Sequence, residues 1–216
     1  MKKIVMLFLL ASSCSLLSAQ QQFKFGVRGG INIASLGDYD HMIGLYEDAE
    51  LENKLGLYAG IFGQLHFSER LGIETGLFYS QLGGKDKEND YNESYKVTAN
   101  PSYLQVPVSM FYKFNLPNEL KLYPSLGLYA GYGLSGNLKT RGNIASEDIG
   151  SDIKYFDDFA KRFDFGGTAG LNLEYRKFIF GLGYDHGFTR VNKNKVVYGD
   201  NAFNSNFRCT LSYVFN

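Results

Sequence analysis

Apolar and polar residues alternate along most of the chain from Phe23 onward. In the first segment, apolar residues between Phe23 and Ile33 alternate with polar residues or glycine between Lys24 and Asn32. A period of two places these two sets on opposite faces of a β-strand. The same pattern recurs at residues 55–67, 71–80, 104–114, 122–134, 164–175, 180–185 and 207–215. A tilted strand needs about nine to eleven residues to cross a membrane, and most of these runs have that length.

The connections between these segments alternate in length. Short links lie at residues 68–70, 115–119 and 176–177, whereas long links lie at residues 34–54, 83–100, 137–162 and 189–204. An even-stranded barrel with short turns on the periplasmic side and long loops outside produces this order. The sequence therefore predicts an all-β fold, an eight-stranded antiparallel up-and-down transmembrane β-barrel.

Alternation alone leaves open which face points inward, so a soluble eight-stranded barrel with an apolar interior is the alternative. The polar face consists mostly of small neutral residues, with fewer charges than a water-exposed exterior carries. Aromatic residues gather at the ends of the apolar face, as in the girdles of membrane barrels. They are Phe23, Phe67, Phe114, Tyr175, Tyr213 and Phe215 near the short turns, and Tyr79, Tyr132, Phe165, Tyr184 and Phe207 near the long loops. These features favour lipid outside the apolar face.

Composition narrows the class further. With 44% hydrophobic and 20% charged residues the chain is too apolar to be disordered, and its mean hydropathy of -0.20 argues against a bundle of membrane helices. The 22 basic and 22 acidic side chains balance, so no nucleic-acid partner is expected. The 25 Gly, 16 Tyr and 18 Phe disfavour helices and favour strands.

The first residues have the pattern of an export signal. Lys2 and Lys3 precede a short apolar run, and Ala19 offers a small residue for cleavage, so residues 1–19 are expected to be a signal peptide and residues 20–216 the barrel domain. Lipidation at Cys14 is the alternative, but the residue three positions earlier is Ala11 rather than Leu. After cleavage Cys209 is the remaining thiol, and its position on an apolar strand face favours a structural role.

Eight strands enclose a space that side chains just fill, so the glycines of the polar face make room for inward aromatic rings. The inward charges are expected to form an ion-pair network across the lumen: Lys24, Arg28, Glu74, Asp164, Glu174, Asp185 and Arg208. Glu74 and Glu174 lie near the short turns with Lys24 and Lys113. Arg28 and Arg208 should line one wall, opposite the acids of residues 164–175 and 180–185. Filling the lumen is the favoured role of this network, and an ion or substrate path is the alternative.

Several segments resemble the PorT-like outer-membrane β-barrel domain family. They are Tyr103-Leu104-Gln105-Val106-Pro107-Val108, Tyr123-Pro124-Ser125-Leu126-Gly127-Leu128-Tyr129, Phe163-Asp164-Phe165-Gly166-Gly167, Gly181-Leu182-Gly183-Tyr184 and Leu211-Ser212-Tyr213-Val214-Phe215. The resemblance covers nearly the whole mature chain. It implies an eight-stranded barrel in the outer membrane, with some members tied to protein secretion, and it supplies no catalytic residues.

The long loops are the better place to look for function. Residues 34–54 carry an acidic loop, Asp38, Asp40, Glu47, Asp48, Glu50 and Glu52, against Lys54 alone. Such a run can attract Ca²⁺ or basic partners, and is more often a solvated surface. In residues 137–162, the spacing of apolar side chains fits a short amphipathic helix. These are Ile149, Ile153, Tyr155, Phe156 and Phe159.

No catalytic constellation stands out. Of the two acid–histidine pairs, Asp40-His41 and Asp185-His186, the second falls on a strand, where adjacent residues point to opposite faces. No metal-ligand spacing, phosphate loop or nucleophile elbow is recognised, so we expect no enzyme activity and no cofactor.

These observations predict an integral outer-membrane barrel with a filled lumen and a structural or interaction role through its long external loops. The alternative is an accessory component of an outer-membrane protein secretion system; a small porin-like channel or a rim enzyme is less favoured. The expected partners are outer-membrane lipid and lipopolysaccharide, the barrel-assembly machinery, and envelope or secretion proteins.

Overall fold

The computed structural model describes residues 22–37, 50–90, 93–144, 147–156, 160–190 and 203–215. These residues form a sheet of thirteen strands. The strands are β1 (Gln22–Gly37), β2 (Glu50–His66), β3 (Leu71–Gln81), β4 (Gly84–Asp90), β5 (Glu93–Ala99), β6 (Ser102–Tyr112), β7 (Phe114–Asn115), β8 (Leu120–Ser135), β9 (Asn137–Ile144), β10 (Glu147–Lys154), β11 (Phe163–Tyr175), β12 (Phe178–Gly187) and β13 (Phe203–Val214).

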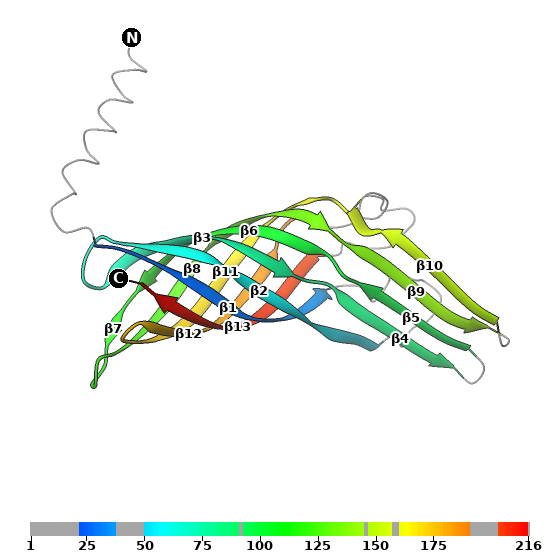
Figure 1. Ribbon diagram of the computed structural model, residues 1–216, viewed down its shortest axis with the longest axis horizontal. Coiled ribbons are helices and arrows are strands. Elements are labelled where there is room, and N and C mark those ends of the chain that lie inside the picture. Colours follow the sequence, from blue (N-terminus) through cyan, green and yellow to red (C-terminus); the bar gives the residue numbers. More distant parts are fainter. Residues whose placement is uncertain are drawn as a thin grey trace, which may run out of the picture.

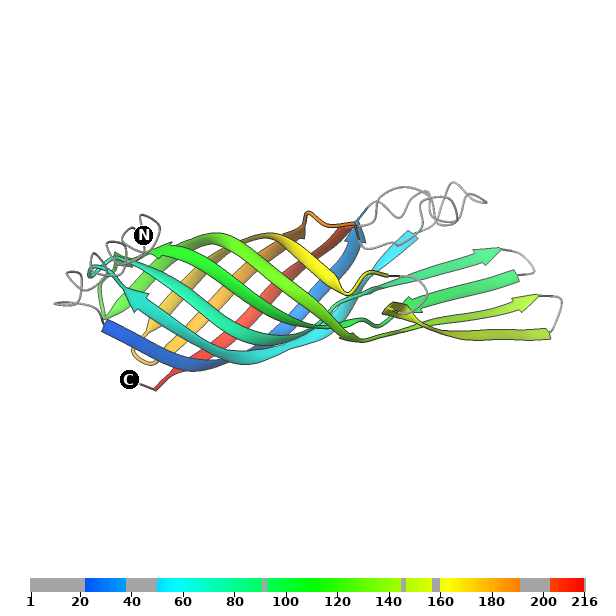
Figure 2. The same ribbon diagram turned by 90° about the horizontal axis from the view of Figure 1, so that it is seen from above.

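Eight of these strands close into a barrel. Their order is β1-β13-β12-β11-β8-β6-β3-β2, and β1 pairs with β2 to complete the ring. All neighbours are antiparallel, and the short β7 continues the line of β6 beside β8. Figures 1 and 2 show the tilted strands wound around one axis, with the start of β1 and the end of β13 at the same end of the barrel. The predicted eight-stranded antiparallel fold is confirmed.

The apolar residues of each strand point outward, as the alternation predicts. Leu126 and Leu128 in the middle of β8 are 71% and 50% exposed, while Tyr123 and Tyr129 on the other face of the same strand are buried. A belt of apolar side chains of this extent would be unfavourable in water and is the normal surface of a barrel in lipid.

Tight turns join the strands at the end where the termini lie. Asn118 and Glu119, between β7 and β8, both have positive φ angles of 63° and 62°, and Arg176, between β11 and β12, has a φ of 54°. Two successive residues with positive φ match the twist of an antiparallel hairpin and allow a minimal loop. The exposed side chains of Arg176 and Glu119 pair at 3.1 Å and connect the two turns. The hydrogen bond from Arg176 to Glu119 raises the pKa of the guanidinium.

At the opposite end, part of the sheet continues beyond the barrel. Residues Glu50–Asn53 of β2 pair with β4, which is followed by β5, β9 and β10. We call these five strand segments the extension sheet; Figure 2 shows its two hairpins projecting past the barrel rim. The long links predicted at residues 83–100 and 137–162 are therefore largely β-hairpins.

The amphipathic helix predicted within residues 137–162 is wrong. Ile149 and Ile153 lie in β10, which pairs with β9 over eight positions. A separation of four residues places side chains on one face of a strand as well as of a helix, so the spacing did not distinguish the two. Tyr155 and Phe156 follow β10 and are buried, and Phe159 lies outside the described residues.

Replacing Leu128 with arginine tests the face assignment. Leu128 lies near the middle of β8 and points outward, so Leu128→Arg places a charge near the midplane of the bilayer. We expect a loss of roughly 2–4 kcal/mol of folding free energy in lipid vesicles, measured by urea titration. Leu116→Arg, in the turn before β8, is the matched control, with a much smaller expected effect. Equal stability of Leu128→Arg and the wild-type protein would contradict the lipid-facing assignment.

Candidate functional site

The lumen holds the charged side chains predicted from the sequence, together with neutral partners from several strands. Nearest the short turns, the ammonium of Lys113 contacts Glu174 Oε2 at 2.5 Å and Lys24 contacts Glu174 Oε1 at 3.3 Å. Lys113 also donates to Gln64 at 3.2 Å and lies over the rings of Phe111 and Tyr123. Lys113 is 1% exposed, so its charge depends on Glu174.

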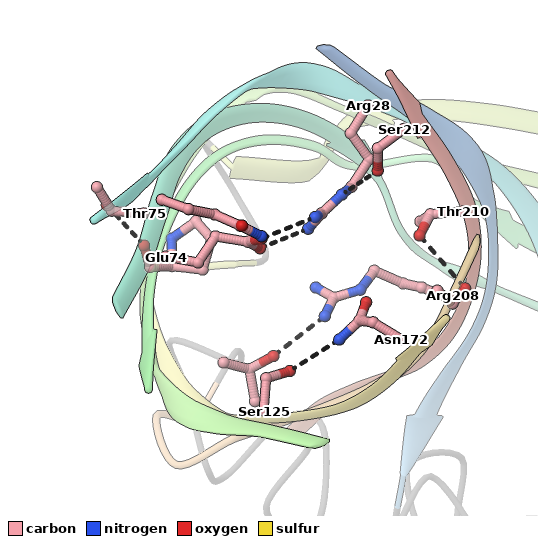
Figure 3. Close-up of polar contacts among 12 residues, drawn as sticks. Arg28, Glu74, Thr75, Ser125, Asn172, Arg208, Thr210 and Ser212 are labelled. Atoms are coloured by element: carbon pink, nitrogen blue, oxygen red, sulfur yellow. Dashed lines mark hydrogen bonds and ion pairs between the residues drawn. The ribbon is translucent and has the colours of Figure 1, made fainter. Parts of the chain in front are cut away.

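A second ion pair crosses the lumen between β1 and β3. Arg28 binds both carboxylate oxygens of Glu74, at 2.7 and 3.0 Å, and donates through Nε to Ser212 at 2.8 Å. Gln64 donates to Glu74 at 2.8 Å. The Arg28 guanidinium also lies 4.5 Å from the centre of the Phe62 ring. Figure 3 shows Arg28 and Glu74 pointing toward each other inside the barrel, from the two strands that flank β2. The two parallel hydrogen bonds fix the orientation of the guanidinium relative to the carboxylate.

A third pair forms between neighbouring strands. Arg208 on β13 contacts Asp185 on β12 at 2.5 Å and donates to Thr168 on β11 at 3.1 Å. The Tyr58 ring lies 5.0 Å from the guanidinium carbon. A Cβ at Gly183 would lie 2.8 Å from Arg208 Nη2, so a larger residue there would require the guanidinium to shift. The glycine therefore leaves space for the guanidinium of Arg208.

This arrangement differs in part from the network expected from the sequence. Arg28 pairs with Glu74 of β3 and not with the acids of β11 and β12, so the predicted opposition of the two arginines to those acids is wrong for Arg28. Asp164 pairs with no lysine, arginine or histidine in the described part of the chain. The neutral partners Gln64 and Ser212 belong to the predicted inward face. A glutamine or a serine on that face does not by itself indicate that it binds a charged side chain, so the sequence did not reveal these contacts.

The space left between the two arginines is small. A polar cavity of about 30 Å³ lies among Arg28, Glu74, Thr168, Asn172 and Arg208. Figure 3 shows Asn172 and Ser125 closing one side of it, where the Asn172 amide donates to Ser125 at 3.3 Å. A cavity of this size holds a few water molecules and no larger solute.

Aromatic side chains close the end of the lumen that faces the extension sheet. Tyr103, Tyr155 and Phe156, here called the aromatic cap, are each 3% exposed or less and pack with Leu82 and Ala34. The Phe156 ring meets both Tyr103 and Tyr155 edge-on, with centroids 5.3 and 5.1 Å away. The Arg162 guanidinium lies 5.3 Å from the Phe156 ring. The cap therefore fills space at the outer end of the polar interior.

A model of the family described as outer membrane protein beta-barrel domain matches residues 18–192. The chain belongs to this family. The assignment agrees with the closed barrel and its apolar outer belt, and it indicates an outer-membrane location. The comparison with curated proteins gave no match.

Solved structures of outer-membrane barrels are similar to this member of the family in fold. OprG from Pseudomonas aeruginosa has 13% identity and a TM-score of 0.45, with 91% of this chain and 98% of OprG covered. Ail of Yersinia pestis has 12% identity and a TM-score of 0.39, with 90% and 98% covered. The outer membrane enzyme PagL has 10% identity and a TM-score of 0.39, with 89% and 99% covered. At such identities the likeness concerns the fold alone.

The acidic loop falls mostly outside the described residues: this applies to Asp38, Asp40, Glu47 and Asp48. The remaining two, Glu50 and Glu52, lie in β2, opposite Lys87 and Lys85 of β4 in the strand register. A Ca²⁺ site in the loop stays a prediction.

The structure also locates the second acid–histidine pair, Asp185-His186. Asp185 faces the lumen, whereas His186 is exposed on the outer face among Tyr184, Phe188 and Phe203, so the two cannot act as a dyad. Among the described residues, no three His, Cys, Asp or Glu side chains cluster as a metal site. No helix in that same part of the chain is long and apolar enough to cross a membrane.

Removing the carboxylate of Glu174 tests how much the innermost pair stabilises the barrel. Glu174→Gln leaves the buried Lys113 ammonium without a counter-charge, so we expect a loss of roughly 3–5 kcal/mol in urea unfolding. The double variant Lys113→Met/Glu174→Leu should recover most of this loss, since it removes both buried charges. Glu119→Gln, which removes the exposed turn pair, is the control and should change little. Wild-type stability of Glu174→Gln would contradict the dependence of Lys113 on Glu174.

Proposed function

We propose that this barrel acts by binding a protein partner outside the membrane through its extension sheet, and that it is neither an enzyme nor a general diffusion pore. The observation that carries this proposal is the free edge of β10. In the described part of the chain, β10 pairs with β9 on one side and with no strand on the other.

An open sheet edge presents unpaired backbone N–H and C=O groups that another strand can use. Within a bilayer such an edge is not tolerated, but β10 lies beyond the barrel, where water satisfies these groups until a partner does. The hairpins β4–β5 and β9–β10 stiffen each other through the pairing of β5 with β9. A preformed edge of this kind binds an extended segment without first ordering a loop, which lowers the entropic cost of binding.

The filled lumen supports the same proposal. In the described part of the chain, the ion pairs, the inward tyrosines and the aromatic cap fill much of the barrel interior, and the cavity between Arg28 and Arg208 is about 30 Å³. Little space therefore remains for a solute path along the axis. The filled lumen therefore favours a function at the outer surface of the barrel.

A second candidate is an accessory role in protein secretion across the outer membrane. It rests on the resemblance of Tyr103-Leu104-Gln105-Val106-Pro107-Val108 and Phe163-Asp164-Phe165-Gly166-Gly167 to PorT-like barrels. Purification of the tagged barrel in detergent should return secretion components if this role holds. Recovery of other surface partners, or of none from the secretion apparatus, favours the first proposal.

Removal of the outer hairpin tests the proposed binding edge. Residues 138–153 are replaced by Gly-Asn, so that Asn137 and Lys154, which pair in the wild-type register, flank a two-residue turn. The barrel should still fold, as judged by heat-modifiable migration on gels. A photo-cross-linker at position 85 of β4, which both proteins keep, should capture a surface partner in the intact protein and lose most of it in the shortened one.

The control for this experiment replaces Ala145-Ser146 by Asn-Gly and keeps both strands of the hairpin. It should cross-link like the wild-type protein. Identical cross-linked products from the hairpin-deleted and control proteins would contradict a role for the β10 edge.

Electrical recording tests the filled lumen. Purified protein in planar bilayers should give no large, stable conductance steps, because ion pairs and the aromatic cap occupy the axis. Phe156→Ala removes one cap ring and serves as a comparison, in which brief openings are expected to increase. Large stable pores formed by the wild-type protein would refute the filled lumen.

A further inference from the structure

Charged residues on the two hairpins of the extension sheet are sorted by face. In β4, residues 85–90 alternate between positions that are basic or neutral and positions that are acidic. Residues two apart on a strand share a face, so the lysines and the acids of β4 lie on opposite faces. The strand register extends this separation to β5 and β9, whose basic residues fall in line with those of β4. The shared face, here called the basic face, carries Lys85, Lys87, Lys96, Lys139 and Arg141.

Lys96 of β5 occupies the central position of the basic face. Directly opposite it in the register lie two further basic residues, Lys87 of β4 and Arg141 of β9. Like charges directly opposite each other on adjacent strands are destabilising. The positions that surround Lys96 on its face hold no acid. They are the basic residues Lys85, Lys87, Lys139 and Arg141 and the neutral residues Asn89, Ser94, Thr98 and Asn143.

Acidic residues border the basic face without reaching its centre. On one side, two glutamates of β2 lie opposite the lysines of β4. On the other side, Asp152 of β10 lies opposite Lys139, and Gly150 lies opposite Arg141. Lys96 and Arg141 therefore have no acid directly opposite them, and Arg141 is exposed. Neighbouring strands are about 4.8 Å apart, so like charges are concentrated in a small area, which favours binding of an anion.

The basic face begins where the barrel ends, as the extension sheet in Figure 2 shows. Exposed Tyr79 and Tyr132 mark the membrane interface at this end, and Ala99 at the end of β5 is buried with the aromatic cap. Lys96 lies three residues beyond Ala99, which is roughly 10 Å along an extended strand. The polar layer of a bilayer extends about 5–8 Å beyond the hydrocarbon on each side. The basic face therefore lies next to the layer that holds the phosphate groups of the outer leaflet.

We propose that the basic face binds phosphate groups of the lipopolysaccharide that surrounds the barrel in the outer leaflet. Lysine and arginine bind phosphate through charge-assisted hydrogen bonds, and Lys96 and Arg141 supply the charge that no facing acid balances. Ser94 and Thr98, on either side of Lys96 in β5, add neutral donors suited to a phosphorylated sugar. The site is a face of the sheet and not the β10 edge, so the inference does not rest on protein binding by that edge.

Titration calorimetry on the full barrel, folded in uncharged detergent, tests this site with a soluble probe. The probe is lipopolysaccharide freed of its acyl chains, which keeps the phosphorylated sugars; the comparison probe is the same saccharide after enzymatic removal of its phosphates. We expect saturable binding of the first probe and roughly tenfold weaker binding of the second. Lys96→Gln/Arg141→Gln should weaken binding of the phosphorylated probe by about tenfold or more. The control Lys161→Gln/Arg190→Gln, which removes two exposed cations outside the extension sheet, should leave it nearly unchanged.

Other outcomes of the titration overturn the proposal. They are the absence of binding, equal affinity for the two saccharides, and equal affinity of the Lys96→Gln/Arg141→Gln and control proteins. A deca-glutamate peptide that binds as tightly as the phosphorylated probe would indicate an acidic protein segment as the ligand, and overturns it too.

Hydrogen exchange covers the case in which the variant disturbs the extension sheet. Because Lys96 lies opposite two cations, Lys96→Gln should leave the protection of the β5 and β9 amides unchanged or raise it. Lower protection would show that Lys96 has a structural role and would overturn the proposal.

A photo-cross-linker in native outer membranes locates the contact. Position 94 shares the face of Lys96, whereas position 93, also in β5, lies on the opposite face. The cross-linker at position 94 should give adducts with lipopolysaccharide, and at position 93 few or none. Equal yields at the two positions contradict binding on the basic face.

Discussion

The absence of water in the hydrocarbon core is the constraint on which the rest of this structure depends. Backbone N–H and C=O groups in lipid must find partners within the protein, and a sheet meets this need only when it closes and leaves no edge. The pairing of β1 with both β13 and β2 provides that closure. Closure with eight strands then fixes a narrow interior, so every inward side chain must share space with others. Gly133 and Gly183 show the result, because a Cβ at these positions would lie 2.3 Å from the Phe156 ring and 2.8 Å from the Arg208 side chain.

The same constraint explains why the sheet changes character at the barrel rim. Beyond the membrane, an edge is no longer forbidden, and β4, β5, β9 and β10 continue from β2 as an open sheet. The apolar alternation ends at this boundary: residues 84–90 read Gly-Lys-Asp-Lys-Glu-Asn-Asp, with no apolar side chain. Hydrophobic pattern therefore marks where the chain meets lipid rather than where it is strand.

This boundary decides how much the sequence alone could predict. The eight barrel strands and the direction of each side chain follow from a period of two, and lumen-facing residues such as Arg28 and Glu174 are placed correctly. The extension sheet was predicted as loops because its strands are short and mostly polar, and β4 carries no apolar side chain. The helix expected around Ile149 and Ile153 failed since a spacing of four fits both structures.

Partners in the lumen could not be predicted for a different reason. Which cation meets which acid depends on the stagger between strands and on the reach of each side chain, and neither is encoded locally. Arg28 spans the interior to Glu74, 46 residues away in sequence, while Arg208 binds Asp185 on the adjacent strand. The partners of neutral residues are harder to predict still, because nothing in the sequence distinguishes Gln64 from Gln105.

Gln64 and Gln105 show how far the lumen departs from simple filling. Gln64 bridges Glu74, Lys113 and the Tyr123 hydroxyl, so its amide is fully used between charges that are already balanced. Gln105 has the same chemistry and similar burial, yet neither the oxygen nor the nitrogen of its amide has a hydrogen-bond partner. A lumen selected only for packing would favour an apolar residue at position 105, because a buried amide without partners is costly.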